Sequence, residues 1–289
     1  MEARTRAAGL PAMLTLISRL SCRRAGTRFN ARGIDDDGNV ANFVETETVV
    51  WNPGYGESAR PVTFSYCQIR GSVPLFWEQQ TGILPNQQKI QITRSPEATQ
   101  PAFDKHMDGL VLKYWAVHIV NLLSERKSGE AELSARYRKH IRHSPLLADS
   151  KHSGHGRNAA ALLRSTEYDF HAETKGSAGY EAASQIRHIV EESADGFGYF
   201  LAEGRSKRED EQEDNLLSIL QQKGAFRTNC LDCLDRTNLV QGIFSKAAIE
   251  SFLDHRAEIV GHDFWMRHST LWADNGDVGL HYSIWSTNN

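Results

Sequence analysis

A cysteine and an arginine with five residues between them bound the segment Cys230 to Arg236, which reads CLDCLDR. This spacing is typical of a loop whose backbone amides surround a phosphate while the arginine completes the ring with a bidentate contact. A strand is predicted before the loop (225–227) and a helix after it (237–253), so the helix N-terminus would favour an anion. The same field would hold Cys230 as the attacking thiolate. Arg236 is the second predicted catalytic residue, and the predicted phosphate contacts are Leu231, Cys233, Leu234, Asp235 and Thr237.

Two carboxylates inside an anion-binding loop require a role, because ionised and inward-facing they would repel a phosphate. A phosphomonoester leaving group needs a proton, and a carboxyl group with a raised pKa can donate it. Asp232 is the first candidate for this general acid, and Asp235 is expected to brace the loop. Asp169 and His171 are outside candidates for the acid, and the choice stays open here.

The same loop contains a C-x-x-C pair, which is also typical of zinc knuckles and of dithiol redox sites. A structural zinc site usually has four ligands, and the remaining cysteines, Cys22 and Cys67, are isolated. The arginine that follows the pair favours phosphate binding over redox chemistry. Two pairs of histidines could suggest a metal, but their polar surroundings favour a solvated loop: His140 with His143, and His152 with His155. No metal is expected.

Composition sets the remaining limits. The chain has 289 residues, 40% hydrophobic content and a formal net charge of −3, which fits a globular protein and does not indicate a nucleic-acid partner. Few, scattered cysteines favour a reducing compartment. No apolar run approaches the ~20 residues that span a bilayer. The basic region Arg126 to Arg164 is a candidate membrane-facing surface.

The pattern of apolar residues predicts an α/β fold. A helix is predicted over 1–21 from the spacing of Leu14, Ile17 and Leu20. Strands are predicted on both sides of an Asp-Gly turn within 28–51, then over 62–69, 73–77, 89–93 and 196–201, with a strand end at 168–171. Further helices are predicted over 101–122, 133–141, 180–192 and 216–221.

The segment Arg227 to Asn238 resembles the catalytic loop of the Sac-domain phosphoinositide phosphatases. Other segments that resemble family blocks are 24–29, 32–35, 38–47, 70–79, 103–106, 168–171 and 272–277. The resemblance covers roughly residues 18–277 and is nearest to the synaptojanin-like branch. It implies a Sac catalytic domain with a central mixed sheet flanked by helices and a C-x5-R loop between strand and helix.

The resemblance also implies an activity. Family members hydrolyse phosphomonoesters on the inositol ring of phosphatidylinositol phosphates through a phosphocysteine intermediate, without an obligatory metal or other cofactor. The expected partners are phosphoinositide lipids and the cytoplasmic membrane surface, and the expected location is cytoplasmic and peripheral at membranes. Which ring phosphate is removed stays open.

The resemblance divides the chain into three expected parts. Residues 1–21 are expected to be a remnant of an N-terminal subdomain, 22–277 the catalytic domain, and 278–289 an atypical C-terminal tail, so that the chain is expected to be truncated at both ends. A catalytically inert fragment that acts as a membrane or protein interaction module is the alternative, and a thiol redox protein is the third hypothesis.

Overall fold

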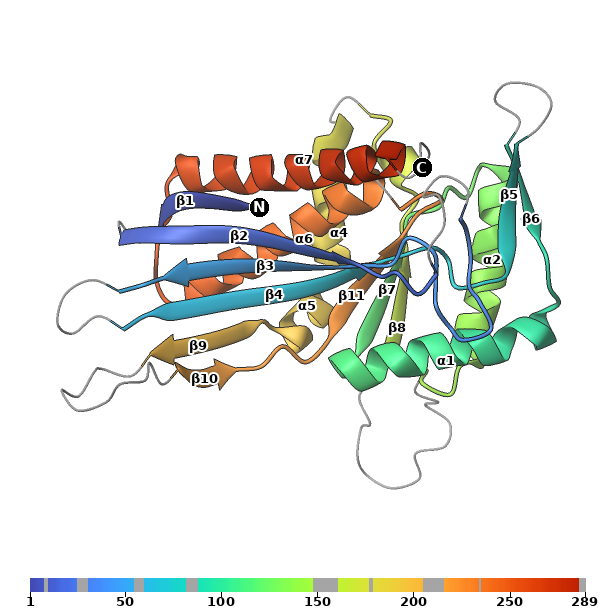
Figure 1. The fold of residues 1–289 in the computed structure, drawn as a ribbon, viewed down its shortest axis with the longest axis horizontal. Helices are drawn as coiled ribbons and strands as arrows, with labels where there is room; N and C mark the ends of the chain where they lie inside the picture. The colour runs from blue at the N-terminus through green and yellow to red at the C-terminus, as the bar shows by residue number, and fades with distance from the viewer. Residues whose placement is uncertain are drawn as a thin grey trace.

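Helices cover both faces of a large mixed sheet (Figure 1). The computed structural model describes residues 1–7, 10–24, 31–54, 60–81, 88–147, 161–176, 179–204, 216–233 and 235–285. The strands of the large sheet are β1 (Glu2–Ala7), β2 (Leu10–Leu20), β3 (Val44–Asn52), β4 (Val62–Arg70), β7 (Val117–Asn121), β8 (Leu163–Glu167), β9 (Phe200–Gly204), β10 (Leu216–Leu220) and β11 (Ala225–Asn229). Strands β5 (Trp77–Thr81) and β6 (Gln88–Ile92) form a separate antiparallel pair.

The main strand order is β1-β2-β3-β4-β11-β7-β8. Strand β11 lies between β4 and β7 and is parallel to both, and β8 is parallel to β7. The other pairs, including β9 with β4, are antiparallel. The predicted α/β class with a central mixed sheet is therefore confirmed. Because parallel strands end at the same edge of a sheet, β7, β8 and β11 deliver the residues that follow them to one place.

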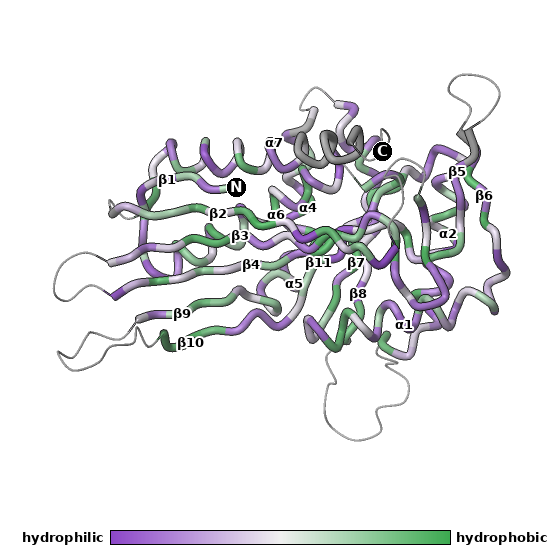
Figure 2. The backbone as a smooth tube through the Cα atoms, in the orientation of Figure 1, coloured by the Kyte–Doolittle hydropathy of each residue, from purple (hydrophilic) through white to green (hydrophobic). Residues whose placement is uncertain are grey.

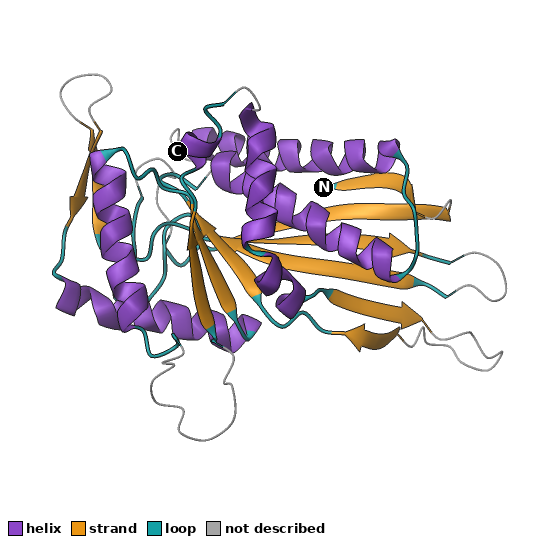
Figure 3. Ribbon diagram, turned by 180° about the vertical axis from the view of Figure 1, so that it is seen from behind, coloured by secondary structure: helices purple, strands orange, loops and turns teal. Residues whose placement is uncertain are grey.

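The helices form two layers (Figure 3). They are α1 (Pro96–Tyr114), α2 (Ser128–His143), α3 (Phe170–Glu173), a 3-10 helix (Gly179–Gln185), α4 (Ile186–Ile189), α5 (Glu191–Phe197), α6 (Asp235–His255) and α7 (His262–Trp285). Side chains that alternate along β7 separate two cores: Ile119 packs with residues of α1 and α2, and Val120 packs with residues of α4 to α7. Figure 2, which colours the backbone by hydropathy, accordingly shows hydrophobic stretches in the central strands.

The predicted helix over 1–21 is wrong, because the described part of this segment forms β1 and β2. Ala12, Leu14 and Leu16 are buried with the period of two that a strand requires, whereas Leu20 is 65% exposed. Pairing of β2 with β3 stabilises the strand, and this non-local contact overrides the local helical spacing.

Three further predictions need correction. The helix over 101–122 ends at Tyr114, where Trp115 adopts a φ of 75°, and a buried strand follows. Residues 216–221 form mostly strand β10 rather than a helix, because they pair with β9. The strand over 73–77 is wrong, since β5 begins only at Trp77.

Most other predicted elements are found with shifted ends, including those over 62–69, 89–93, 133–141, 225–227 and 237–253. In the part of the chain that the structure describes, no helix has the length and apolarity needed to cross a bilayer.

Candidate active site

The carboxyl ends of the parallel strands are joined by buried polar side chains. The Asn229 side chain at the end of β11 donates to Asn121 Oδ1 at the end of β7 over 2.6 Å. Asn121 Nδ2 in turn donates to Glu167 Oε2 at the end of β8 over 2.7 Å and to Ser134 Oγ over 2.9 Å. These contacts fix the positions at which the three strands end, so the segments that follow start from a rigid base.

Cys230 is the first residue after β11 and is completely buried. Its Sγ accepts the backbone N–H of Cys233 over 3.0 Å and lies 3.1 Å from Asp232 Oδ1, to which the thiol can donate. Cys233 has a φ of 60°, a left-handed conformation that is uncommon outside glycine and frequent at functional sites. This turn directs its N–H at the sulfur.

The surroundings of Cys230 act on the pKa of its thiol in both directions. Burial raises the pKa of its thiol above the ordinary value, and the neighbouring Cys233 and Asp232 act in the same direction, whereas the Arg236 guanidinium lowers it. Burial thus opposes the predicted thiolate, and the Arg236 guanidinium favours it.

Arg236 is the second residue of α6, and its side chain is 15% exposed. One guanidinium nitrogen lies 3.6 Å from Glu130 Oε2 of α2 and 3.4 Å from His171 Nε2 of α3. Glu130 is itself held by the Ser124 backbone N–H over 2.8 Å. The arginine is thus oriented by a buried carboxylate, as a residue that binds an oxyanion in a fixed geometry must be.

A second cation stands beside Arg236. Lys127 Nζ lies 3.1 Å from His171 Nε2 and 3.3 Å from Glu130 Oε1. Since both Lys127 and Arg236 donate to the same His171 nitrogen, the ring is neutral. Burial lowers the pKa of His171, and the two cations lower it further. The cluster of Lys127, His171 and Arg236 therefore presents positive charge at the carboxyl edge of the sheet.

Asp169 has a structural task. It caps α3 by accepting the Ala172 backbone N–H over 3.0 Å, and it accepts the Glu125 backbone N–H over 2.9 Å. Burial raises the pKa of Asp169, but these hydrogen bonds outweigh burial and hold the pKa below its ordinary value. An ionised cap is a poor proton donor, so these contacts do not favour Asp169 as the acid.

The remaining predicted residues take different places. Leu231 is half-buried against the core of α1 and α2, Thr237 is fully buried, and Asp235 is exposed at the start of α6. Leu234 lies outside the described residues. Cys230 and Cys233 are free thiols, as are the other two cysteines.

The histidines considered as metal ligands do not form one group. His140 is buried, with Nδ1 2.6 Å from Gln100 Oε1, whereas His143 Nδ1 contacts the Lys139 carbonyl of its own helix over 2.7 Å. His152 and His155 lie outside the described residues, as does part of the basic region (148–160).

Arg32 is a site residue that spacing could not reveal. Its guanidinium is buried and interacts electrostatically with Cys230, Asp232 and Cys233. Its Nε donates to Gln79 Oε1 over 3.0 Å, which positions it from β5. The only signal in the sequence is its place in the segment 32–35, which resembles a family block.

Residues 2–175 match the SacI homology domain family. The chain is 46% identical over 265 residues to inositol-1,4,5-trisphosphate 5-phosphatase 1 of Schizosaccharomyces pombe, a match that covers 92% of the chain and 21% of that protein. It is 45% identical over 274 residues to polyphosphatidylinositol phosphatase INP53 of Saccharomyces cerevisiae, with 93% of the chain and 22% of the relative covered. It is 38% identical over 276 residues to human synaptojanin-1, a match that covers 94% of the chain and 15% of that protein.

The chain therefore spans about a fifth of the length of these curated relatives, or less. Cys230 lies beyond the residues of the family match, but it is too far from either end to fall outside a match that covers 94% of the chain. The loop is thus part of the region that is similar to synaptojanin-1.

Proposed function

Because the chain belongs to the SacI homology domain family, we propose that it is a phosphoinositide phosphatase that removes phosphate from the inositol ring of phosphatidylinositol phosphates. The observation that carries this proposal is the position of Cys230 and Arg236, one after a parallel strand and the other in the first turn of the following helix. The names of the relatives, which include a polyphosphatidylinositol phosphatase, support the substrate class.

In the first step Cys230 Sγ attacks phosphorus and forms an S–P bond, while the bond from phosphorus to the inositol oxygen breaks. The thiol passes its proton to Asp232 over the 3.1 Å contact, and Asp232 delivers a proton to the leaving oxygen. Arg236 and the backbone amides of loop positions 231, 233, 234, 235 and 237 bind the equatorial oxygens, whose charge they stabilise in the transition state.

In the second step water attacks the phosphocysteine. The S–P bond breaks, and inorganic phosphate leaves. Asp232, ionised after the first step, accepts a proton from the water and returns one to the thiolate of Cys230, so the enzyme is restored. Every bond change uses protein side chains and water alone.

The substrate is a lipid, so we propose that the protein works at the cytoplasmic surface of a membrane. Lys127, His171 and Arg236 lie at the same edge of the sheet as Cys230 and would face an anionic headgroup. We assign this chemistry to the proposed catalytic domain, residues 22–277.

The test compares phosphate release from phosphatidylinositol monophosphates in vesicles by the wild type, Cys230→Ser and Cys22→Ser. Cys22 is exposed, and its substitution controls for the loss of a thiol elsewhere. We expect activity from the wild type and Cys22→Ser, and none from Cys230→Ser. Equal release by wild type and Cys230→Ser would refute the proposal and favour an inert interaction module. A panel of phosphoinositide isomers would then identify the preferred ring phosphate.

A further inference from the structure

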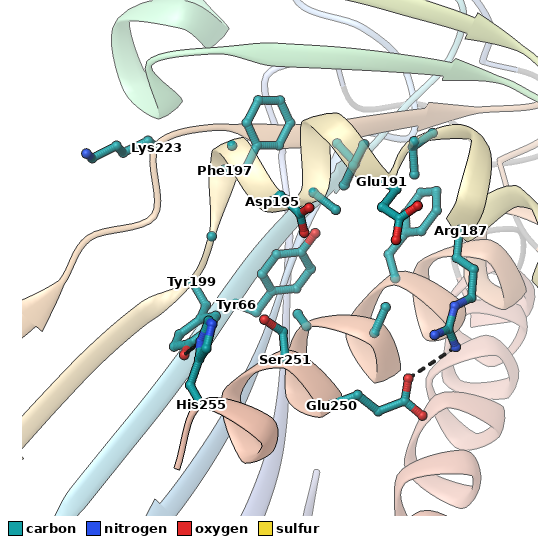
Figure 4. A pocket seen from close by; sticks show the side chains of 18 of the residues that line it. Tyr66, Arg187, Glu191, Asp195, Phe197, Tyr199, Lys223, Glu250, Ser251 and His255 are labelled. Atoms are coloured by element: carbon teal, nitrogen blue, oxygen red, sulfur yellow. Dashed lines mark hydrogen bonds and ion pairs between the residues drawn. The ribbon is translucent and has the colours of Figure 1, made fainter. Parts of the chain in front are cut away.

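A cavity of about 690 Å³ opens at the far end of β11 and α6 from the candidate active site (Figure 4). This volume is in the range of small-molecule sites. Phe226, near the start of β11, lines it, whereas Cys230 follows the end of that strand. Ser251 also lines it, and at 1.5 Å per helical residue it lies about 22 Å along α6 from Arg236. The cavity is therefore separate from the proposed phosphatase site.

The floor and walls of the cavity are rich in aromatic rings. They come from four elements and the segment before β9: Tyr66, Phe197, Tyr199, Phe226 and Phe244. The rings pack on one another, with the centroids of Phe197 and Phe226 5.3 Å apart and those of Phe226 and Phe244 4.6 Å apart. Aromatic faces bind apolar bodies and attract organic cations.

The lining carries an excess of negative charge. Four carboxylates face two permanent cations, Arg187 and Lys223, if the histidines are not counted. Among the described residues of the lining, Glu250 is the one carboxylate in an ion pair, with Arg187 at 3.2 Å and Lys246 at 3.9 Å. Within the described residues, Glu191, Asp195 and Asp254 make no ion pair and no side-chain hydrogen bond. Glu191 and Asp195 point from α5 into the cavity (Figure 4).

Tyr66 offers a further hydrogen-bonding group in the cavity. The residue is 3% exposed, yet across the described part of the chain its hydroxyl has no hydrogen-bond partner. Its ring points from β4 into the cavity, with the hydroxyl on the side of Asp195 (Figure 4). The hydroxyl can therefore hydrogen-bond to a group that enters the cavity.

We propose that this cavity binds an organic cation, an ammonium or guanidinium group carried on an apolar or aromatic body. The charge lies between Asp195 and Glu191, where it also hydrogen-bonds to the Tyr66 hydroxyl, and the body packs on the accessible parts of Phe197 and Phe244. A free amine and a lysine or arginine side chain of a peptide offer this same chemistry. The inference does not depend on the phosphatase activity.

Calorimetric titration of the full chain tests it with three probes: tryptamine, indole-3-propionate with the same ring and a negative charge, and the peptide acetyl-Phe-Arg-Phe-amide. We expect tryptamine or the peptide to bind at least tenfold more tightly than indole-3-propionate. Asp195→Asn should weaken binding about tenfold and Tyr66→Phe several-fold. Glu192→Gln is the matched control, because Glu192 lies on the same helix, pairs with Arg164 at 3.0 Å and does not line the cavity.

Each result has a definite meaning. Binding of tryptamine that depends on Asp195 supports a free amine, and Asp195-dependent binding of the peptide alone supports a peptide side chain. Absence of binding by both cations, equal binding by indole-3-propionate, or equal binding to wild type and Asp195→Asn would overturn the proposal. Asp195 is exposed, so its variant should fold, and thermal melts of all variants verify this.

Discussion

Protonation of His106 should destabilise the fold as the pH falls below neutrality. This buried side chain of α1 lies between two fixed groups: Nδ1 is 2.8 Å from the Gly38 carbonyl, and the Arg227 Nε–H donates to Nε2 over 3.1 Å. Nδ1 must therefore carry the proton and Nε2 must accept. Adding a second proton would break the contact with Arg227 and bury two positive charges together. Burial lowers the pKa of His106 to about 3, and Arg227 contributes in the same direction.

The magnitude follows from linkage. The unfolded chain protonates His106 with a pKa of about 6.5, while the folded chain resists protonation until far lower pH. The contribution of the neutral ring to stability is thus complete above pH ~6.5 and is lost as the pH falls toward 3. At about 1.4 kcal/mol per pH unit, the linkage of His106 alone lowers the free energy of unfolding by about 2 kcal/mol when the pH falls from 7 to 5. Burial also lowers the pKa of His118 and His268 to about 4. The whole protein therefore loses more stability with falling pH than His106 alone accounts for.

Urea denaturation of the wild type and His106→Gln at pH 7, 6 and 5 isolates the contribution of His106. The variant should be less stable at pH 7 by about 1–3 kcal/mol, because the buried partners of His106, the Gly38 carbonyl and the Arg227 Nε–H, lose a hydrogen bond. Its further loss between pH 7 and pH 5 should be about 2 kcal/mol smaller than that of the wild type. Leu110→Ala, a buried change on the same helix, is the control: it should lower stability equally at each pH. An equal loss with pH in His106→Gln and the wild type would refute the reasoning.

Three other substitutions test the proposed site. Arg236→Lys should reduce kcat/KM for phosphoinositide hydrolysis about 10²–10³-fold, since an ammonium cannot make the bidentate contact, and full activity would contradict the role of the guanidinium. Asp232→Asn should lower kcat about 10²–10⁴-fold on phosphoinositides and by a smaller factor on p-nitrophenyl phosphate, whose leaving group needs no proton although the thiol and the water still need Asp232 as base; full activity of the variant on phosphoinositides would exclude Asp232 from the mechanism. Asp169→Ala should lower the free energy of unfolding by about 1–2 kcal/mol and leave the pH profile of activity unchanged, because Asp169 caps a helix.

The loop could be predicted because its information is local. Cys230, Asp232 and Arg236 lie within seven residues, between a short strand and a long helix, and the structure brings the three together. Arg32 and Lys127 could not be predicted as neighbours of the loop, since their positions depend on the order of strands in the sheet. The role of Asp169 could not be predicted from the sequence either, because an aspartate can be a helix cap or a proton donor.

Strands β2 and β10 show where periodicity fails. In 10–20 the apolar residues satisfy both a helical and an alternating spacing, and only the pairing of β2 with β3 decides between them. Strand β10 has no buried face, so Leu216 and Ile219 carry no pattern that could identify a strand. In both cases the deciding contacts are with distant segments.

The central position of β11 has a consequence for how the protein folds. Arg227 pairs in register with Ile69 on one side and Ile119 on the other, so the strand joins segments that are synthesised long before it. Such non-local pairings carry a high loop-closure entropy and slow folding. Until β11 has been synthesised, β7 and the end of β4 lack the strand that pairs with both, so backbone N–H and C=O groups at these edges lack their final partners. Cys230, the first residue after β11, therefore reaches its position in the same event in which β11 joins β4 to β7.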